Sequence, residues 1–114
     1  MRNMAYLREE KENLEVAYPI NAIWEAVPKV IAKLEWKIQE ANEGAHHLKV
    51  KTKGAFMSYP STLLIDLAAV NDKTTRVSIT AETPVTTITS IADFGRTRER
   101  IEQFVATLAK LMSS

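Results

Sequence analysis

The feature that most constrains this chain is a series of alternating segments separated by turns of a few residues. Alternation of apolar and polar side chains at every second position is typical of a β-strand with one buried face. It occurs over 47–53, 61–70 and 75–83, with a glycine after the first segment and an Asn-Asp-Lys turn after the second. Short connections join antiparallel neighbours, because a parallel crossover needs about a dozen residues or more. The pattern therefore predicts one antiparallel sheet.

Two further strands are expected nearer the N-terminus. One starts at Leu14 and stops before Pro19, which has no N–H to donate to a ladder. The other starts at Trp36 and runs to a turn near Gly44, where glycine can adopt a positive φ. With the three segments above, they bring the predicted sheet to five strands.

Two segments repeat apolar residues at the spacing of an amphipathic helix. The first follows Asn21, a predicted N-cap, and Pro28 inside it predicts a bend or a break. The second follows Asp93 and Gly95, while the residues before it, 84–92, fit both a loop and an earlier helix start. The two apolar stripes consist of Ile20, Ile23, Trp24, Val27, Val30, Ile31 and Leu34, and of Ile101, Phe104, Val105, Leu108, Leu111 and Met112.

The predicted order of elements is β-α-β-β-β-β-α. Placing both helices on the apolar face of the sheet buries all three apolar surfaces, which predicts an α+β two-layer sandwich, an antiparallel sheet with two helices on one face. A chain of 114 residues has room for one such core. The predicted boundaries are an N-terminal extension over 1–13, frayed or briefly helical, and a single α+β domain over 14–114.

Charge and cysteine content exclude several function classes. The 15 Lys and Arg residues nearly balance the 14 Asp and Glu residues, whereas nucleic-acid-binding domains normally carry a clear basic excess. The chain has no cysteine, which excludes thiol nucleophiles, disulfides and thiolate metal sites. No segment has the pattern of a signal peptide or approaches the ~20 apolar residues of a membrane span. We therefore expect a cytoplasmic protein without a membrane partner.

The histidines and serines form no recognisable catalytic or metal site. His46 and His47 are neighbours, and neighbouring residues on a strand point to opposite faces, so the two cannot bind one metal together. No Gly-x-Ser-x-Gly motif marks a nucleophilic serine. From these patterns we expect exposed histidines, no catalytic residue, no metal and no cofactor.

Asp66 interrupts an apolar strand and admits two interpretations. By alternation it lies on the solvent face, where it would pair across the ladder with Lys49, Lys51, Lys53 or Arg76. It would act as a general base only if that face were covered. The three lysines form a basic row on the same sheet face, which carries no aromatic wedge. No nucleic-acid partner is therefore expected.

Arginines and aromatic residues are the candidate ligand-binding side chains. Arg96 and Arg100 lie at the start of the second helix, where guanidinium groups and a helix N-terminus can hold a phosphate or a carboxylate. Their alternative role is to pair with Glu99, Glu102 or solvent. The aromatic candidates for an apolar ligand, which would otherwise pack in the core, are Trp24, Trp36, Phe56, Tyr59 and Phe104.

Four segments resemble sequences of known small domains: YPINAIWEA over 18–26, LEWKI over 34–38, TRVSI over 75–79 and DFGR over 93–96. They are similar to the strand, helix and sheet re-entry segments of helix-grip, START-like (polyketide-cyclase-like) domains and of TATA-binding-protein-like folds. The last segment resembles small bacterial domains of unknown function. The resemblance covers roughly residues 14–112 and implies an α+β fold, without assigning a site residue.

These observations favour a binder of a small apolar ligand or of a protein partner over an enzyme, as a monomer or a homodimer. Two alternatives remain. One is a START-like or cyclase-like enzyme with Asp66 or Tyr59 beside a small cavity, and the other is a structural module that dimerises through its sheet. An apolar cavity of roughly 300 Å³ or more with a converging polar group would favour a ligand or catalysis over the module.

The absence of thiolates and of convergent histidines predicts how the protein responds to chelator and reductant. Neither reagent should change the Tm, because the sequence offers no site that either would empty or reduce. Differential scanning fluorimetry with and without EDTA or dithiothreitol measures this directly. A shift of several degrees with EDTA would show that the chain holds a structural metal after all.

Overall fold

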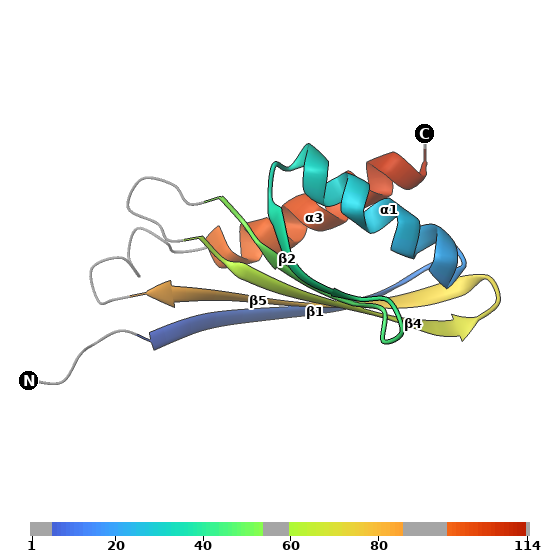
Figure 1. Cartoon of the computed structure of the whole chain (residues 1–114), viewed down its shortest axis with the longest axis horizontal. Coiled ribbons are helices and arrows are strands. Elements are labelled where there is room, and N and C mark those ends of the chain that lie inside the picture. The colour runs from blue at the N-terminus through green and yellow to red at the C-terminus, as the bar shows by residue number, and fades with distance from the viewer. Residues whose placement is uncertain (1–5, 54–59, 86–95, 114) are drawn as a thin grey trace, which may run out of the picture.

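The structure, a computed structural model, describes residues 6–53, 60–85 and 96–113 (Figure 1). Its elements follow the predicted order. They are β1 (Tyr6–Val16), α1 (Ile20–Lys33), β2 (Lys37–Asn42), β3 (His47–Lys51), β4 (Thr62–Asn71), β5 (Thr74–Val85) and α3 (Arg96–Met112).

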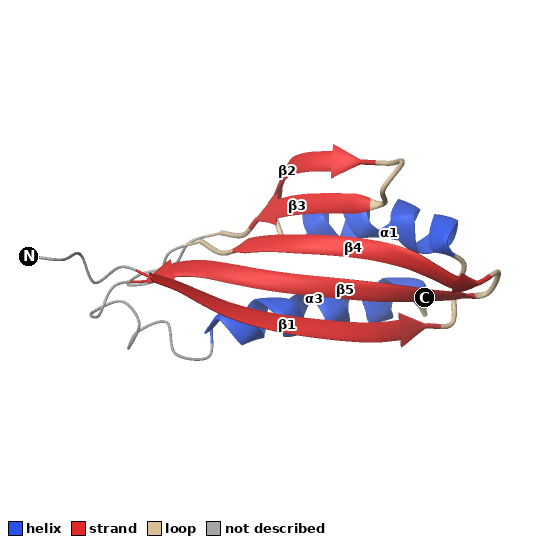
Figure 2. Cartoon of the chain, turned by 90° about the horizontal axis from the view of Figure 1, so that it is seen from below, coloured by secondary structure: helices blue, strands red, loops and turns tan. Residues whose placement is uncertain are grey.

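The strands form one antiparallel sheet in the order β1-β5-β4-β3-β2. The first strand therefore pairs with the last, and β1 and β2 are the two edges. Figure 2 shows both helices behind the same face of the sheet, and the opposite face is left uncovered by them. The predicted two-layer α+β sandwich with its helices on one face is confirmed.

The N-terminal strand is longer than expected. Residues 6–13 pair with β5 in continuous register from Tyr6 opposite Val85, so the expectation of a frayed or helical segment is wrong there. Glu10 and Glu12 lie opposite Ala81 and Ile79, on the face that carries the core. Because charged side chains occupy these inward positions, the apolar alternation that marks a half-buried strand begins only at Leu14.

The two helices bury their apolar stripes against the inner face of the sheet. α1 continues through Pro28, which is exposed, so the expected break does not occur. Phe104 of α3 is fully buried at the centre of the helix–sheet interface. The remaining core side chains are Ile23, Ala26, Val27, Val30, Ile31, Trp36, Leu48, Val50, Leu63, Ile65, Leu67, Val77, Ile79, Ala81, Ile101 and Leu108.

Trp24 occupies the margin of this core. It is partly buried, and its ring meets that of His46 edge to face, with centroids 5.2 Å apart. His46 lies in the turn before β3 with a φ of 50°, rather than on the strand itself. Trp24 lies near the start of α1, whereas Trp36 follows its end, so the two tryptophans do not share a site.

The burial of Phe104 predicts a large loss of stability on truncation. Phe104→Ala should lower the free energy of unfolding by about 3–5 kcal/mol, because it removes a fully buried ring from a filled core. Lys110→Ala, on the exposed side of the same helix, should change it by less than about 0.5 kcal/mol. Urea denaturation measures both, and equal effects of the two substitutions would contradict this packing.

Candidate functional site

The inner face of the sheet changes from apolar to polar beneath the N-terminal part of α3. Four hydroxyl side chains and one arginine are buried there, from the end of β3, the start of β4, β5 and α3. They are Thr52, Ser61, Thr83, Thr97 and Arg100. Buried polar groups are stable only when hydrogen bonded, so their contacts determine what this end of the molecule can do.

The hydroxyl groups bond to one another across the sheet. Ser61 Oγ lies 2.5 Å from Thr83 Oγ1, and Thr83 Oγ1 lies 2.8 Å from Thr97 Oγ1. The backbone N–H of Ser61 donates to Thr52 Oγ1 over 2.8 Å. These bonds link the first turn of α3 to β5, to the residue just before β4 and to the residue just after β3.

Arg100 joins this network from α3. It is 7% exposed, and its Nη1 donates to Ser61 Oγ over 2.7 Å, while Nη2 donates to the backbone carbonyl of Lys53 over 3.5 Å. A guanidinium stays charged in a protein. These two acceptors hold the charged group in a fixed orientation.

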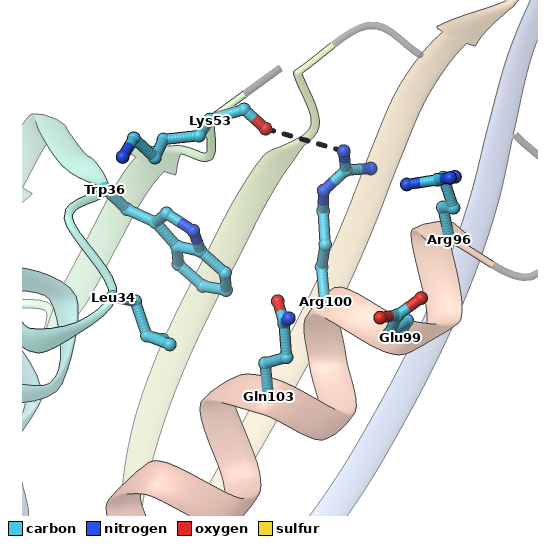
Figure 3. A pocket seen from close by; sticks show the side chains of 7 residues that line it. All are labelled: Leu34, Trp36, Lys53, Arg96, Glu99, Arg100 and Gln103. Carbon is cyan, nitrogen blue, oxygen red and sulfur yellow. Dashed lines mark hydrogen bonds between the residues drawn. The ribbon is translucent and has the colours of Figure 1, made fainter. Parts of the chain in front are cut away.

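A pocket of about 270 Å³ lies beside Arg100, between α3 and the connection from α1 to β2 (Figure 3). We call it the Trp36 pocket. Leu34 and Trp36 form its apolar side, and the side chains of α3 face them. Its seven lining residues are Leu34, Trp36, Lys53, Arg96, Glu99, Arg100 and Gln103.

The end of α1 places Trp36 in this pocket. Glu35 adopts a φ of 60°, and the Trp36 backbone N–H donates to the Ile31 carbonyl over 3.0 Å, which turns the chain from helix into strand. Glu35 Oε1 also lies 3.1 Å from Lys53 Nζ. Trp36 is 9% exposed, and its indole N–H donates to no residue in the described part of the chain.

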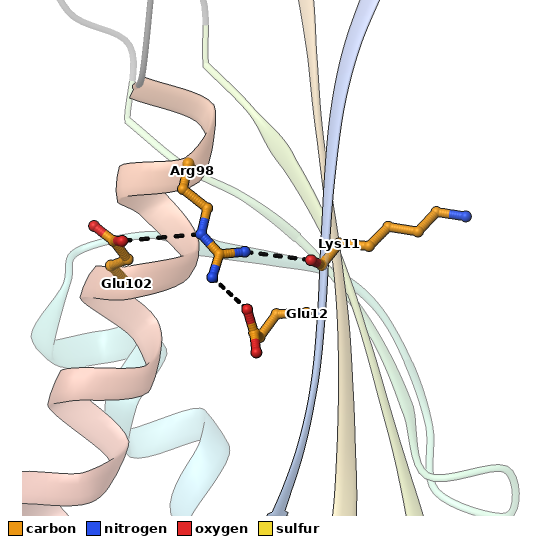
Figure 4. A network of polar contacts seen from close by, with 4 residues as sticks. All are labelled: Lys11, Glu12, Arg98 and Glu102. Atoms are coloured by element: carbon orange, nitrogen blue, oxygen red, sulfur yellow. Dashed lines mark hydrogen bonds and ion pairs between the residues drawn. The ribbon is translucent and has the colours of Figure 1, made fainter.

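A second hollow, the β1–α3 groove, runs along the sheet edge between Leu14 and Val105. It consists of two spaces of about 210 and 360 Å³ that share these residues and Ala109. Its charged side chains contact one another (Figure 4). Arg98 contacts Glu12 through Nη2, donates to the Lys11 carbonyl over 3.2 Å, and lies 3.9 Å from Glu102.

The Glu12 hydrogen bond raises the pKa of Arg98 above its ordinary value, because the bond stabilises the charged form. Arg98 and Glu12 thus satisfy each other at the edge of the β1–α3 groove. Most of the other residues that line the groove are apolar.

Asp66 lies on the uncovered face of the sheet, away from both hollows. Its Oδ1 is 2.6 Å from His47 Nδ1, directly across the β3–β4 ladder. The expected lysine or arginine partner is therefore wrong: Lys53 pairs with Glu35 and Arg76 with Glu15. Among the described residues, no three His, Cys, Asp or Glu side chains are arranged to hold a metal ion.

Three of the candidate ligand-binding residues meet in the Trp36 pocket, namely Trp36, Arg96 and Arg100. Phe104 packs in the core instead, and Trp24 lies at the far end of α1. Phe56 and Tyr59, like the predicted N-cap Asp93 and residues 86–92, lie outside the described residues.

The sequence reasoning missed Leu34, Lys53 and Gln103 as pocket residues, and the buried hydroxyl network entirely. The sequence does contain one indication of part of this network. Arg100 precedes Phe104 by four residues and Thr97 precedes it by seven, which places both on the buried stripe of α3. Polar residues within a buried stripe indicate a site with partners for them.

No protein-family model matches the sequence, and the search of curated proteins gave no match. None of the helices in the described segments is long and apolar enough to cross a membrane.

Solved structures match over nearly the whole chain. A norcoclaurine synthase point mutant from Thalictrum flavum is 12% identical, with 94% of each chain covered and a TM-score of 0.72. A conserved protein from Geobacillus kaustophilus is 14% identical, covering 93% of this chain and 95% of its own, with a TM-score of 0.67. Ara h 8.0201 is 10% identical, covering 96% and 100%, with a TM-score of 0.63. The chain therefore has the helix-grip, START-like fold that the sequence segments resemble.

The hydroxyl network predicts a specific loss of stability. Ser61→Ala should lower the free energy of unfolding by about 1–3 kcal/mol, because it removes an acceptor from the buried Arg100 and a partner from Thr83. Ser78→Ala, on the outer face of β5, should change it by less than about 0.5 kcal/mol. Chemical denaturation of the two variants compares them, and a neutral Ser61→Ala would contradict the network.

Proposed function

We propose that this chain binds a small organic molecule with an apolar, ring-sized body in the Trp36 pocket. The observation that carries this proposal is the pairing of two surfaces across one cavity. Leu34 and Trp36 offer apolar area on one side, while Arg100 and Gln103 offer polar groups on the other. Ligand pockets typically combine an apolar lining with a few converging polar groups.

The size of the cavity limits the ligand. A volume of about 270 Å³ lies just below the roughly 300 Å³ at which drug-sized pockets begin, so a single ring with a short substituent suits it. The core beneath is filled by fully buried side chains such as Phe104 and Leu63. The ligand would therefore lie between Trp36 and α3 rather than deeper in the sandwich.

The β1–α3 groove, with a space of about 360 Å³, is larger but less suited to a specific ligand. Arg98 and Glu12 are satisfied by each other, so this pair is not available to orient a bound molecule. Specific small-molecule sites depend on a small number of such groups. We therefore assign the ligand to the Trp36 pocket.

The structural neighbours support a ligand of this size. Norcoclaurine synthase from Thalictrum flavum, at 12% identity, has been solved in complex with dopamine and hydroxybenzaldehyde, each a single-ring molecule. Because that neighbour is an enzyme, cyclase-like catalysis is the second candidate function. We favour binding, since Asp66, the candidate general base, lies on the opposite face of the sheet from the pocket.

Blocking each hollow in turn tests this function. Gln103→Trp should fill the Trp36 pocket from its exposed rim and weaken the binding of single-ring aromatic fragments by at least about tenfold. Ala106→Trp, one turn further along α3, should fill the β1–α3 groove and leave binding unchanged. Ligand-observed NMR of the purified chain measures both. If Ala106→Trp weakened binding and Gln103→Trp did not, the ligand would lie in the β1–α3 groove and the assignment would be wrong.

A further inference from the structure

We propose that the molecule bound in the Trp36 pocket carries a carbonyl or ether oxygen, which accepts a hydrogen bond from the indole N–H of Trp36. This inference rests on the proposed function and narrows its ligand class to small ring compounds with an oxygen that accepts and does not donate. It requires no charge on the ligand. Arg96 and Arg100 have partners within the chain, so the inference does not depend on either.

The indole N–H of Trp36 is a buried donor in the wall of the pocket. Trp36 is 9% exposed, and none of the described residues accepts a hydrogen bond from its ring nitrogen. In Figure 3 that nitrogen lies on the edge of the ring turned toward Lys53 and Arg100. A buried tryptophan N–H usually has a partner, so this one indicates a place where an acceptor binds.

The acceptors that the chain itself brings to this side of the pocket are bonded to other donors. The backbone carbonyl of Lys53 accepts from Arg100 Nη2 over 3.5 Å. The carboxylate of Glu35 accepts from Lys53 Nζ over 3.1 Å. Glu99 and Gln103 lie on α3, across the pocket from the indole, and both are exposed (Figure 3). The partner of the indole N–H must therefore come from the contents of the pocket.

The position of the indole is fixed before any ligand arrives. Glu35 adopts a φ of 60°, and the backbone N–H groups of Glu35 and Trp36 donate to the Ala32 and Ile31 carbonyls, each over 3.0 Å. This turn sets the backbone, and the ring packs in the hydrophobic core. The donor therefore cannot turn away to find another partner, and a group fixed in advance loses less conformational entropy on binding.

A ligand that fills the pocket displaces solvent from this N–H. A purely apolar ring would leave the donor without an acceptor, which opposes binding. A carbonyl or ether oxygen replaces the lost bond, and it is satisfied by the indole alone because it has no hydrogen to donate. A hydroxyl group can also accept, but its own hydrogen needs a second partner. The indole therefore favours an oxygen that only accepts.

A matched pair of probes tests this acceptor. Acetophenone and 2-phenylpropene have the same ring and nearly the same shape, but the carbonyl oxygen of the first is a methylene group in the second. Trp36→Phe keeps an aromatic ring and removes the N–H. We expect it to weaken the binding of acetophenone at least about tenfold more than that of 2-phenylpropene, in titrations followed by ligand-observed NMR. Trp24→Phe, near the other end of α1, should change neither affinity.

The outcomes separate this inference from the proposed function. If Trp36→Phe weakens both probes equally, the ring binds in the pocket but the indole N–H does not recognise an oxygen. The acceptor is then overturned and the proposed function stands. If neither probe binds to the wild-type chain, the proposed function fails as well.

The wild-type chain provides a second readout that does not depend on the folding of a pocket variant. It has two tryptophans, whose indole N–H signals in a ¹⁵N–¹H spectrum are assigned with Trp24→Phe, which removes one of them. Acetophenone should move the Trp36 signal further downfield than 2-phenylpropene does, because both rings shift it but only the carbonyl bonds to it. The Trp24 signal should stay in place. Equal Trp36 shifts at saturation with the two probes would exclude the indole as the donor.

Discussion

The burial of Arg100 beneath α3 is the constraint on which the polar end of this structure depends. A guanidinium that is 7% exposed must have acceptors, and Ser61 and the Lys53 carbonyl provide them from the ends of neighbouring strands. Ser61 in turn shares a hydrogen bond with Thr83, which bonds to Thr97 in the first turn of α3. One charged side chain thus fixes where the helix crosses the sheet, and the same contacts leave a guanidinium beside a pocket.

The sequence predicts the elements whose inward-facing side chains are apolar. It does not predict an element whose inward-facing side chains are polar or charged. Leu48 and Val50 are buried and alternate with the half-buried Lys49 and the exposed Lys51, so β3 is recognisable from its own residues. β1 is not recognisable before Leu14, because Glu10 faces inward where an apolar residue would be expected. Pairing with β5 holds that segment in the sheet, and such long-range pairing leaves no periodic signal in the segment itself.

The sequence identifies residues of the candidate site individually, but it does not predict that they line the same pocket. Trp36 stood out as an aromatic residue at the start of a strand, and Arg96 and Arg100 as basic residues at the start of a helix. Their meeting depends on how α3 crosses the sheet, which local pattern does not determine. The partner of Asp66 was missed for a related reason: register decides that His47, rather than a lysine, lies opposite it.

The acidic character of β1 has a consequence for how copies of this protein meet. As an edge strand, β1 has one side with backbone groups not paired within the sheet, the usual template for aggregation. Four glutamates lie along its eleven residues, among two basic ones. A second β1 aligned against it would bring these carboxylates close together, and like charges in facing positions destabilise a ladder. The glutamates of β1 make the strand hard to recognise in the sequence. They also disfavour the addition of a second copy at this edge, and therefore the growth of the sheet into fibrils.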